Sequence, residues 1–228
     1  MIAALAGALL FALLPVPTLG GPVVDRAGVL GPAEKARLDG LARAARDADG
    51  GKGPQLAFLI VPSLDGEPIE SFSIRVAEAW KLGAADRDDG LLFVVSIDDR
   101  AARIEVGGGI EGEISDVQAG RIIRERMLPA FRQGAYGSGL QAGAEEALGL
   151  LGVSAGQGRA PRGGGAPIHP LLVLAVLAAF GIGARLLGIP IRFGGPGGFG
   201  GPGGRRGGGG GYRGGGGGFS GGGASGRW

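Results

Sequence analysis

Residues 90–106 read GLLFVVSIDDRAARIEV, and this stretch decides the fold. It opens with a largely apolar run, Gly90 to Ile97, which has the length and composition of a buried strand. The turn Asp98-Asp99-Arg100 follows. Beyond it, apolar residues alternate with Arg103 and Glu105, which is the pattern of a strand that has one polar face. Because the turn is short, the two strands are predicted to form an antiparallel hairpin.

The segments around the hairpin complete an α/β domain. Residues 55–61, QLAFLIV, form another buried strand, and apolar residues at helical spacing predict a helix from Ile69 to about Lys81. A strand, a helix and a strand in this order predict a right-handed parallel crossover. Together with the antiparallel hairpin, this parallel pair makes the predicted sheet a mixed one. Further helices are predicted at Pro32–Ala48, at Ser115–Gln133, where Pro129 should interrupt the helix, and at Leu140–Leu151. Residues 22–151 are therefore predicted to form one α/β layered domain.

Charge and glycine divide the 228-residue chain into two unlike parts. All 21 acidic residues lie between Asp25 and Glu146 with 15 of the 23 basic ones, so this body carries a net charge of −6. The remaining 8 basic residues are arginines from Arg159 onward, and 22 of the 53 glycines fall in the last 35 residues. This balance excludes a basic nucleic-acid-binding core, and the absence of cysteine excludes a disulfide scaffold and thiolate chemistry.

Two apolar segments predict export and anchoring. Ile2–Leu14 is too short to span a bilayer, and residues 1–20 are expected to be a signal peptide or an N-terminal apolar segment; a buried helix is the alternative. Residues 170–191 are predicted to be a transmembrane helix, because a helix rises about 1.5 Å per residue and the hydrocarbon core is about 30 Å thick. Residues 152–169 would be the linker. Arginines are enriched after this span, so we expect a single-pass protein of the cell membrane, with an extracytoplasmic domain and a cytoplasmic tail.

The tail, residues 192–228, is predicted to be disordered because it has almost no aliphatic side chains. Its stretch RRGGGGGYRGGGGGF contains Tyr212 and Phe219 and allows either RNA binding, as in an Arg-Gly-Gly box, or contact with anionic lipid. We favour lipid, because the tail follows a membrane span, and do not expect a nucleic-acid partner.

Carboxylates cluster in the two loops that the hairpin brings together. Asp88 and Asp89 precede its first strand, and Glu111, Glu113 and Asp116 follow its second. Because the start of one antiparallel strand lies beside the end of its partner, both loops are predicted at one edge of the sheet. Carboxylates without His or Cys select an oxygen-seeking divalent cation, and we expect Ca²⁺ rather than Mg²⁺. The predicted ligands are Asp88, Asp89, Glu111 and Asp116.

Each carboxylate also has a structural interpretation. Asp88 and Asp89 could shape the turn before Gly90, Asp116 could stabilise a helix N-terminus, and Glu105 and Glu113 are expected on solvated faces. Asp25 is either a turn former or a further ligand. The glycines at 107–109 would let the backbone approach a bound group closely.

Other catalytic templates are missing from the body. The single histidine, His169, borders the expected span, so the body lacks Ser-His and His-metal catalysis. No G-x-x-x-x-G-K-[ST] phosphate-binding loop occurs, and the glycines of 107–112 give only weak support for dinucleotide binding.

Three stretches of the body resemble the TPM domain family. They are VVDRAGVLGPAEKARL (23–38), SLDGEPIESFSIRVAEAWKLG (63–83) and DDGLLFVVSIDDRAARIEVGGGIEGEISD (88–116). The tail GGGGFSGGGASGRW resembles that of bacterial members with one membrane span. The resemblance implies a three-layer α/β/α sandwich with a divalent-cation site, and it implies Asp88, Glu111 and Asp116 as ligands; Asp89 stands where the family usually has Asn.

Two functions follow as expectations. The first is a membrane-anchored extracytoplasmic domain that binds a divalent cation and a protein partner in envelope or membrane-protein maintenance. The alternative is a metal-assisted acid phosphatase, an activity described for plant relatives, in which the ion would polarise a phosphoryl oxygen of a phosphomonoester. We favour the first, because the body has no histidine and no arginine pair evidently placed for phosphate.

Overall fold

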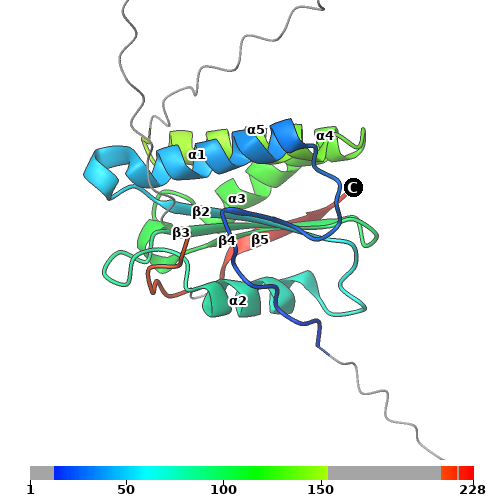
Figure 1. Ribbon diagram of the computed structural model, residues 1–228, viewed down its shortest axis with the longest axis horizontal. Helices are drawn as coiled ribbons and strands as arrows, with labels where there is room; N and C mark the ends of the chain where they lie inside the picture. Colours follow the sequence, from blue (N-terminus) through cyan, green and yellow to red (C-terminus); the bar gives the residue numbers. More distant parts are fainter. Residues whose placement is uncertain (1–12, 154–211, 220) are drawn as a thin grey trace, which may run out of the picture. The chain divides into compact units, whose positions relative to one another are not determined.

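The computed structural model describes residues 13–153, 212–219 and 221–228. These residues form a five-stranded sheet in the order β1-β2-β3-β4-β5 (Figure 1). β1 (Val23–Asp25), β2 (Gln55–Val61) and β3 (Gly90–Ser96) are parallel, whereas β4 (Ala101–Val106) and β5 (Gly222–Arg227) each run antiparallel to the strand before them. The predicted mixed sheet is confirmed.

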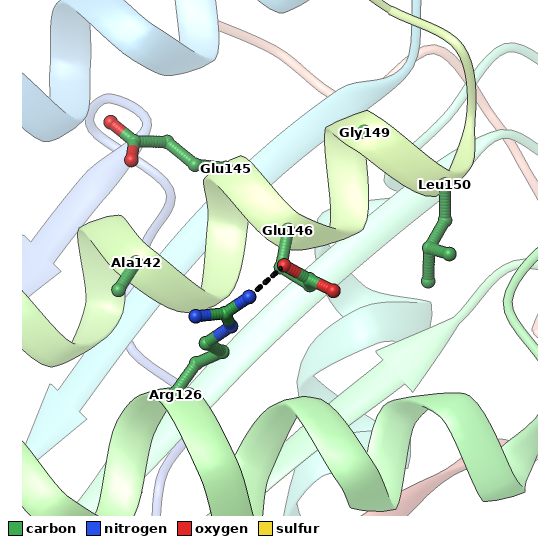
Figure 2. A pocket seen from close by; sticks show the side chains of 6 residues that line it. All are labelled: Arg126, Ala142, Glu145, Glu146, Gly149 and Leu150. Carbon is green, nitrogen blue, oxygen red and sulfur yellow. Dashed lines mark hydrogen bonds and ion pairs between the residues drawn. The ribbon is translucent and has the colours of Figure 1, made fainter.

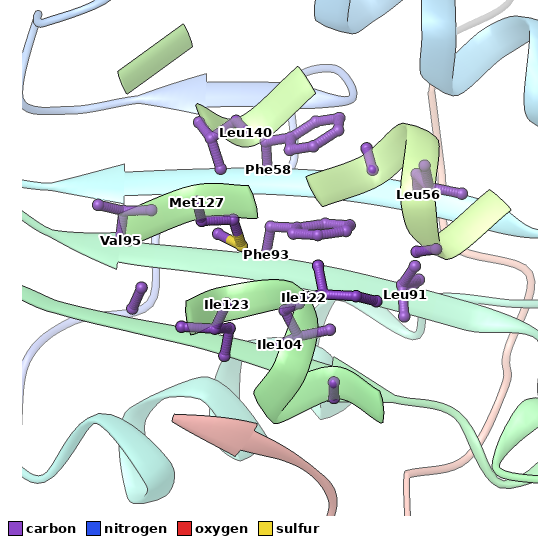
Figure 3. Close-up of a cluster of buried hydrophobic side chains, with 14 of the residues drawn as sticks. Leu56, Phe58, Leu91, Phe93, Val95, Ile104, Ile122, Ile123, Met127 and Leu140 are labelled. Carbon is purple, nitrogen blue, oxygen red and sulfur yellow. The ribbon is translucent and has the colours of Figure 1, made fainter. Parts of the chain in front are cut away.

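Helices cover both faces of the sheet (Figure 1). α2 (Ile69–Trp80) packs alone on one face. The core of the other face centres on Phe58 and Phe93, whose rings stack with centroids 5.1 Å apart (Figure 3). That core is covered by α1 (Pro32–Gly51), α3 (Asp116–Ile122), the π-helical η2 (Ile123–Met127), α4 (Leu128–Phe131) and α5 (Tyr136–Leu150), and the 3-10 turn η1 (Gly108–Ile110) leads into α3.

Local signals explain where these helices begin and change. α1 starts at Pro32, and its backbone leaves the helical conformation at Ala48, as predicted. The backbone N–H of Ser115 donates to Gln118 Oε1 at 2.8 Å and opens α3. Pro129 has no N–H to donate, and the chain adjusts with the π-helical η2 directly before α4 rather than with a break.

The two parallel crossovers differ in hand. β1-α1-β2 and β2-α2-β3 move in the same direction across the sheet, yet α1 and α2 pack on opposite faces. Two such crossovers must have opposite hands, so one of them departs from the right-handed rule. This arrangement lets three adjacent parallel strands receive cover on both faces.

The polar face of β4 is not solvated, and the expectation for Glu105 was wrong. Glu105 is 0% exposed and forms an ion pair with Arg103, whose side chain is 7% exposed. The hydroxyl of Ser73 in α2 donates to Glu105 Oε1 at 2.5 Å. The alternation along β4 therefore reflects a buried polar cluster beneath α2.

The described part of the N-terminal segment packs on α2. The indole N–H of Trp80 donates to the carbonyl oxygen of Pro17 at 2.7 Å, and Arg75 Nη2 donates to that of Leu14 at 2.9 Å. Cleavage after residue 20 would remove both contacts. Residues 1–12, which hold most of the expected signal-peptide core, lie outside the described residues.

The largest departure concerns the C-terminal segment, which we define as residues 212–219 and 221–228. We expected disorder throughout 192–228, but Gly222–Arg227 form β5, paired with β4 over its whole length. Paired strands must lie in one compartment, so this pairing is incompatible with an extracytoplasmic domain and a cytoplasmic tail. No helix of the described part is long and apolar enough to cross a membrane, and the predicted span 170–191 lies outside that part.

Candidate functional site

The two acidic loops meet at one end of the sheet, as the hairpin argument predicted. The N–H of Gly107 donates to the carbonyl of Gly90 at 2.8 Å, and that of Gly109 donates to the carbonyl of Asp88 at 3.2 Å. A Cβ on Gly107 would overlap the backbone of Asp88, and a Cβ on Gly109 would overlap that of Arg87. The glycines therefore allow one loop to approach the other, not a bound group.

Three of the four predicted ligands face the C-terminal segment. Asp88 Oδ1 accepts the backbone N–H of Gly218 at 2.5 Å, and Asp116 Oδ1 accepts that of Gly223 at 2.7 Å. The carboxylate of Glu111 lies against Gly222, where a Cβ would overlap it. A strip of acidic side chains, Asp88, Glu111 and Asp116, thus lies against Gly218, Gly222 and Gly223 of the segment.

Asp89, the fourth predicted ligand, is turned away from this strip. It is buried, its Oδ1 accepts the N–H of Ala84 at 2.8 Å, and its Oδ2 pairs with Arg87 Nε at 2.7 Å. Both oxygens are engaged within their own loop. The turn-shaping interpretation therefore describes Asp89 better than the ligand interpretation.

Asp25 lies at the other end of the sheet and is a turn former. Its carboxylate accepts the N–H groups of Gly28 at 2.7 Å and Leu30 at 3.0 Å, and it pairs with Lys35 at 3.1 Å. Burial opposes the charged form, but the hydrogen bonds from Leu30, Lys35 and Gly28 outweigh it, so the pKa of Asp25 is below its usual value. Glu113 is exposed, as expected.

The C-terminal segment carries three aromatic anchors, of which the sequence analysis had singled out Tyr212 and Phe219, for stacking on RNA or contact with lipid, but not Trp228. Tyr212 is buried and donates its hydroxyl to the carbonyl of Leu56. The guanidinium groups of Arg43 and Arg46 lie over its ring, 5.8 and 5.6 Å from the centroid. Burial raises the pKa of this hydroxyl. Phe219 is partly buried and packs against the core that α2 covers. In the sequence, the only sign that this segment packs on the domain is the presence of these aromatic residues among the glycines.

Trp228 is the third anchor and closes the segment. Its ring centroid lies 5.0 Å from that of Phe131 and 6.0 Å from that of Tyr136, both in edge-to-face geometry. Its backbone N–H donates to the carbonyl of Arg100 at 3.2 Å. The last residue of the chain is thus held by side-chain packing and by the backbone.

A polar cluster lies where α2 covers β4 and β5, and its buried members are Ser73, Arg103 and Glu105. At its exposed margin, Ser225 donates its hydroxyl to Glu70 Oε1 at 2.6 Å, and this bond is the main reason why the pKa of Glu70 lies below its usual value. Glu105 Oε2 is buried and has no hydrogen-bond partner among the described residues. Sequence reasoning missed this cluster, because the same alternation is typical of a solvated strand face.

A model of the TPM domain matches residues 23–149. The chain belongs to the TPM domain family. It is 34% identical to the N-terminal domain of a protein from P. gingivalis, solved in solution, with a TM-score of 0.51 over 58% of this chain and 83% of that one. The N-terminal domain of the cg2496 protein from Corynebacterium glutamicum is 15% identical, with a TM-score of 0.46 over 64% of this chain and 90% of that one. No curated protein matches.

In the present arrangement, the acidic strip of this TPM domain does not fit a divalent cation. No group of three or more carboxylate or imidazole side chains within residues 13–153, 212–219 and 221–228 is placed to hold a metal ion. Asp88 and Asp116 each accept an N–H group of the C-terminal segment, and Asp89 pairs with Arg87. Backbone amides of the segment lie where the predicted cation would need these oxygens.

A pocket on the helical face is separate from the acidic strip. Figure 2 shows Arg126 of η2 reaching toward α5, where its Nη2 pairs with Glu146 Oε2 at 2.8 Å. The other lining residues come from α5: Ala142, Glu145, Gly149 and Leu150. None of the predicted ligands lines this pocket, and its charged groups stabilise the packing of η2 against α5.

Proposed function

We propose that this TPM protein is a membrane-anchored, extracytoplasmic binding module for a divalent cation, Ca²⁺ in preference to Mg²⁺, and for a protein partner in envelope or membrane-protein maintenance. The observation that carries this proposal is the acidic strip: Asp88, Glu111 and Asp116 come from two loops and line one short path. Carboxylate oxygens are the ligands that Ca²⁺ prefers, and the two loops can supply them from one end of the sheet.

The cation binds after the C-terminal segment has moved away. Displacement removes the N–H donors of Gly218 and Gly223 from Asp88 and Asp116. It also uncovers the edge of β4, whose free backbone groups can accept an added strand from a partner. Cation and partner sites therefore lie side by side on the same end of the domain.

Residues 170–191 anchor this chain in the membrane, and the domain lies outside the cytoplasm. Support for the anchor comes from the apolar composition of that segment. When β5 is paired, the C-terminal segment lies on the same side of the membrane as the domain, because β4 and β5 are neighbours in the sheet. Residues 170–191 then hold the membrane without crossing it, and they can cross it only in chains whose β5 is unpaired.

Calorimetric titration of Ca²⁺ into the full chain tests the cation site. We expect weak binding to the wild type, and its loss in Asp88→Asn and Asp116→Asn. Asp98→Asn is the matched control, since Asp98 is exposed at the opposite end of the hairpin and should leave affinity unchanged. Equal Ca²⁺ affinity in all four proteins would refute the site.

Metal-assisted acid phosphatase activity is the second candidate, supported by the name of the matching family model, TPM_phosphatase. The body offers no histidine as an acid or base. Turnover of a phosphomonoester with Ca²⁺ or Mg²⁺ distinguishes the two functions. We expect none above the buffer rate, and a turnover that Asp88→Asn and Asp116→Asn abolish but Asp98→Asn preserves would establish the enzyme instead.

A further inference from the structure

We infer that the edge of β4 is a peptide-recognition site, and that the C-terminal segment is its resident, separable ligand, bound in cis. The ligand class is an extended, glycine-rich peptide that ends in tryptophan. This inference deepens the proposed function and rests on it only where the cation is concerned. It starts from the contacts of the segment itself.

Glycine is required along the segment because the backbone passes too close to the domain for a side chain. A Cβ on Gly214 would overlap the carbonyl of Trp80, and one on Gly217 would overlap that of Leu82. A Cβ on Gly223, whose φ is +135°, would overlap the carbonyl of Ile104. The glycines are therefore recognition features of the segment, and a bulkier peptide would not fit.

Aromatic and polar contacts fix the register of the segment. Tyr212 and Trp228 anchor its two ends, at Leu56 and at the Phe131–Tyr136 pair. Between them, the N–H of Gly216 donates to the carbonyl of Lys81 at 2.9 Å. A shift by one residue would reverse the faces of β5 and remove the Ser225 hydroxyl from Glu70.

The segment is separable because the core does not depend on it. β2, β3 and β4 are buried at every position, whereas every residue of β5 retains some exposure. Apart from Tyr212, the buried hydrophobic side chains of the described residues belong to residues 30–148. β5 itself contributes only glycine, alanine, serine and one exposed arginine side chain. Docking therefore stabilises an existing sheet and does not create it.

The same contacts make the segment a competitor of the predicted cation and partner. It engages Asp88 and Asp116 and pairs with the whole length of β4. Because it belongs to the same chain, the segment has an effective concentration at β4 on the order of 1 mM. A separate peptide of equal affinity would need a higher concentration than this to displace it. Release of the segment would open all of these groups at once.

Peptide exchange in the full chain tests the inference without any cation. A protease site inserted between Gly208 and Gly209 allows one cut that frees the end of the chain while everything before it stays intact. Labelled peptide 212–228 is then added in the presence of a chelator, and its binding is followed by fluorescence anisotropy. We expect the labelled peptide to replace the cut segment.

Peptide variants test the recognition features. Trp228→Ala should bind at least about tenfold more weakly, because it loses two aromatic contacts. Gly223→Val should not bind. Arg213→Ala is the matched control and should bind within about threefold, because the Arg213 side chain is exposed and only its carbonyl is used, by Gln55 Nε2 at 2.9 Å.

Three results would overturn the inference. A cut segment that never exchanges while the domain stays folded would show that it is not separable. A domain that binds neither the cut segment nor the peptide would show that β4 is no recognition site. Co-purification of two differently tagged uncut copies, abolished by Gly223→Val, would show that the segment binds in trans. Because a chelator is present throughout, exchange can succeed even if the Ca²⁺ titration fails.

Discussion

Replacing Arg103 by methionine should be among the most damaging single changes in the domain. The guanidinium is the ion-pair partner of Glu105, which is 0% exposed, and its removal leaves that carboxylate with the Ser73 hydroxyl as its remaining partner among the described residues. Breaking a buried pair from one side costs about 3–5 kcal/mol. The total free energy of unfolding of a domain is about 5–15 kcal/mol, so the loss is a large fraction of it.

Urea unfolding followed by tryptophan fluorescence measures this loss. With a slope of about 2 kcal/mol per molar urea, the midpoint should fall by roughly 2 M. The double variant Arg103→Met with Glu105→Leu should recover most of the stability, because an apolar pair of similar volume needs no compensating charge. Arg37→Met, at an exposed position of α1, should stay within about 0.5 kcal/mol of the wild type.

The reasoning would be refuted by either of two outcomes. One is a loss of less than about 1 kcal/mol of unfolding free energy in Arg103→Met, which would mean that the Glu105 carboxylate can reach water when its partner is removed. The other is a double variant as unstable as the single one, because the loss would then come from packing and not from an unpaired charge.

Three further predictions concern the loops and the effect of pH. Gly109→Ala should cost at least about 2 kcal/mol in urea unfolding, because a Cβ there overlaps the neighbouring loop, whereas Gly112→Ala meets no atom within 4 Å and should change stability by less than about 0.5 kcal/mol. Asp25→Asn should lower the urea midpoint at pH 7; because folding depresses the pKa of Asp25, this gap should shrink as pH falls below the usual value of 3.8, and a gap constant with pH would contradict the assignment. The affinity of the peptide for β4 should be constant above pH 4.5, the usual pKa of a glutamate such as Glu70, and should weaken as the pH falls below that value. The reason is that the hydrogen bond from Ser225 in the docked peptide lowers the pKa of Glu70. An affinity that stays unchanged in anisotropy down to pH 3.5 would contradict this.

The central strands could be predicted from the sequence because their own side chains specify them. Gln55–Val61 and Gly90–Ser96 are largely apolar, with one polar residue each at an end, and they form β2 and β3. β1 has three residues, too few for a periodic signal, and β5 is mostly glycine, which has a low intrinsic preference for strands. β5 forms because it complements β4, and no local property of residues 222–227 reveals that.

The candidate site shows the same division between local and distant information. Hairpin geometry was enough to bring the loop of Asp88 beside that of Asp116, since it depends only on strand order. It could not show that Asp88 faces the C-terminal segment while its neighbour Asp89 turns inward to Arg87. The contacts of Asp88 and Asp116 with the segment join residues more than 100 positions apart, and their partners are backbone N–H groups that any sequence possesses.

The strand order also bears on how a TPM domain is expressed by itself. A fragment cut at residues 23–149 keeps four strands and omits the fifth, so β4 changes from an inner strand to a border with unsatisfied N–H and C=O groups. Exposed edge strands pair with one another, so copies of the fragment would associate through β4. Any dimers or aggregates would then result from the truncation. Joining residues 212–228 to the fragment through a short flexible connector restores the missing neighbour, and the resulting protein should stay monodisperse.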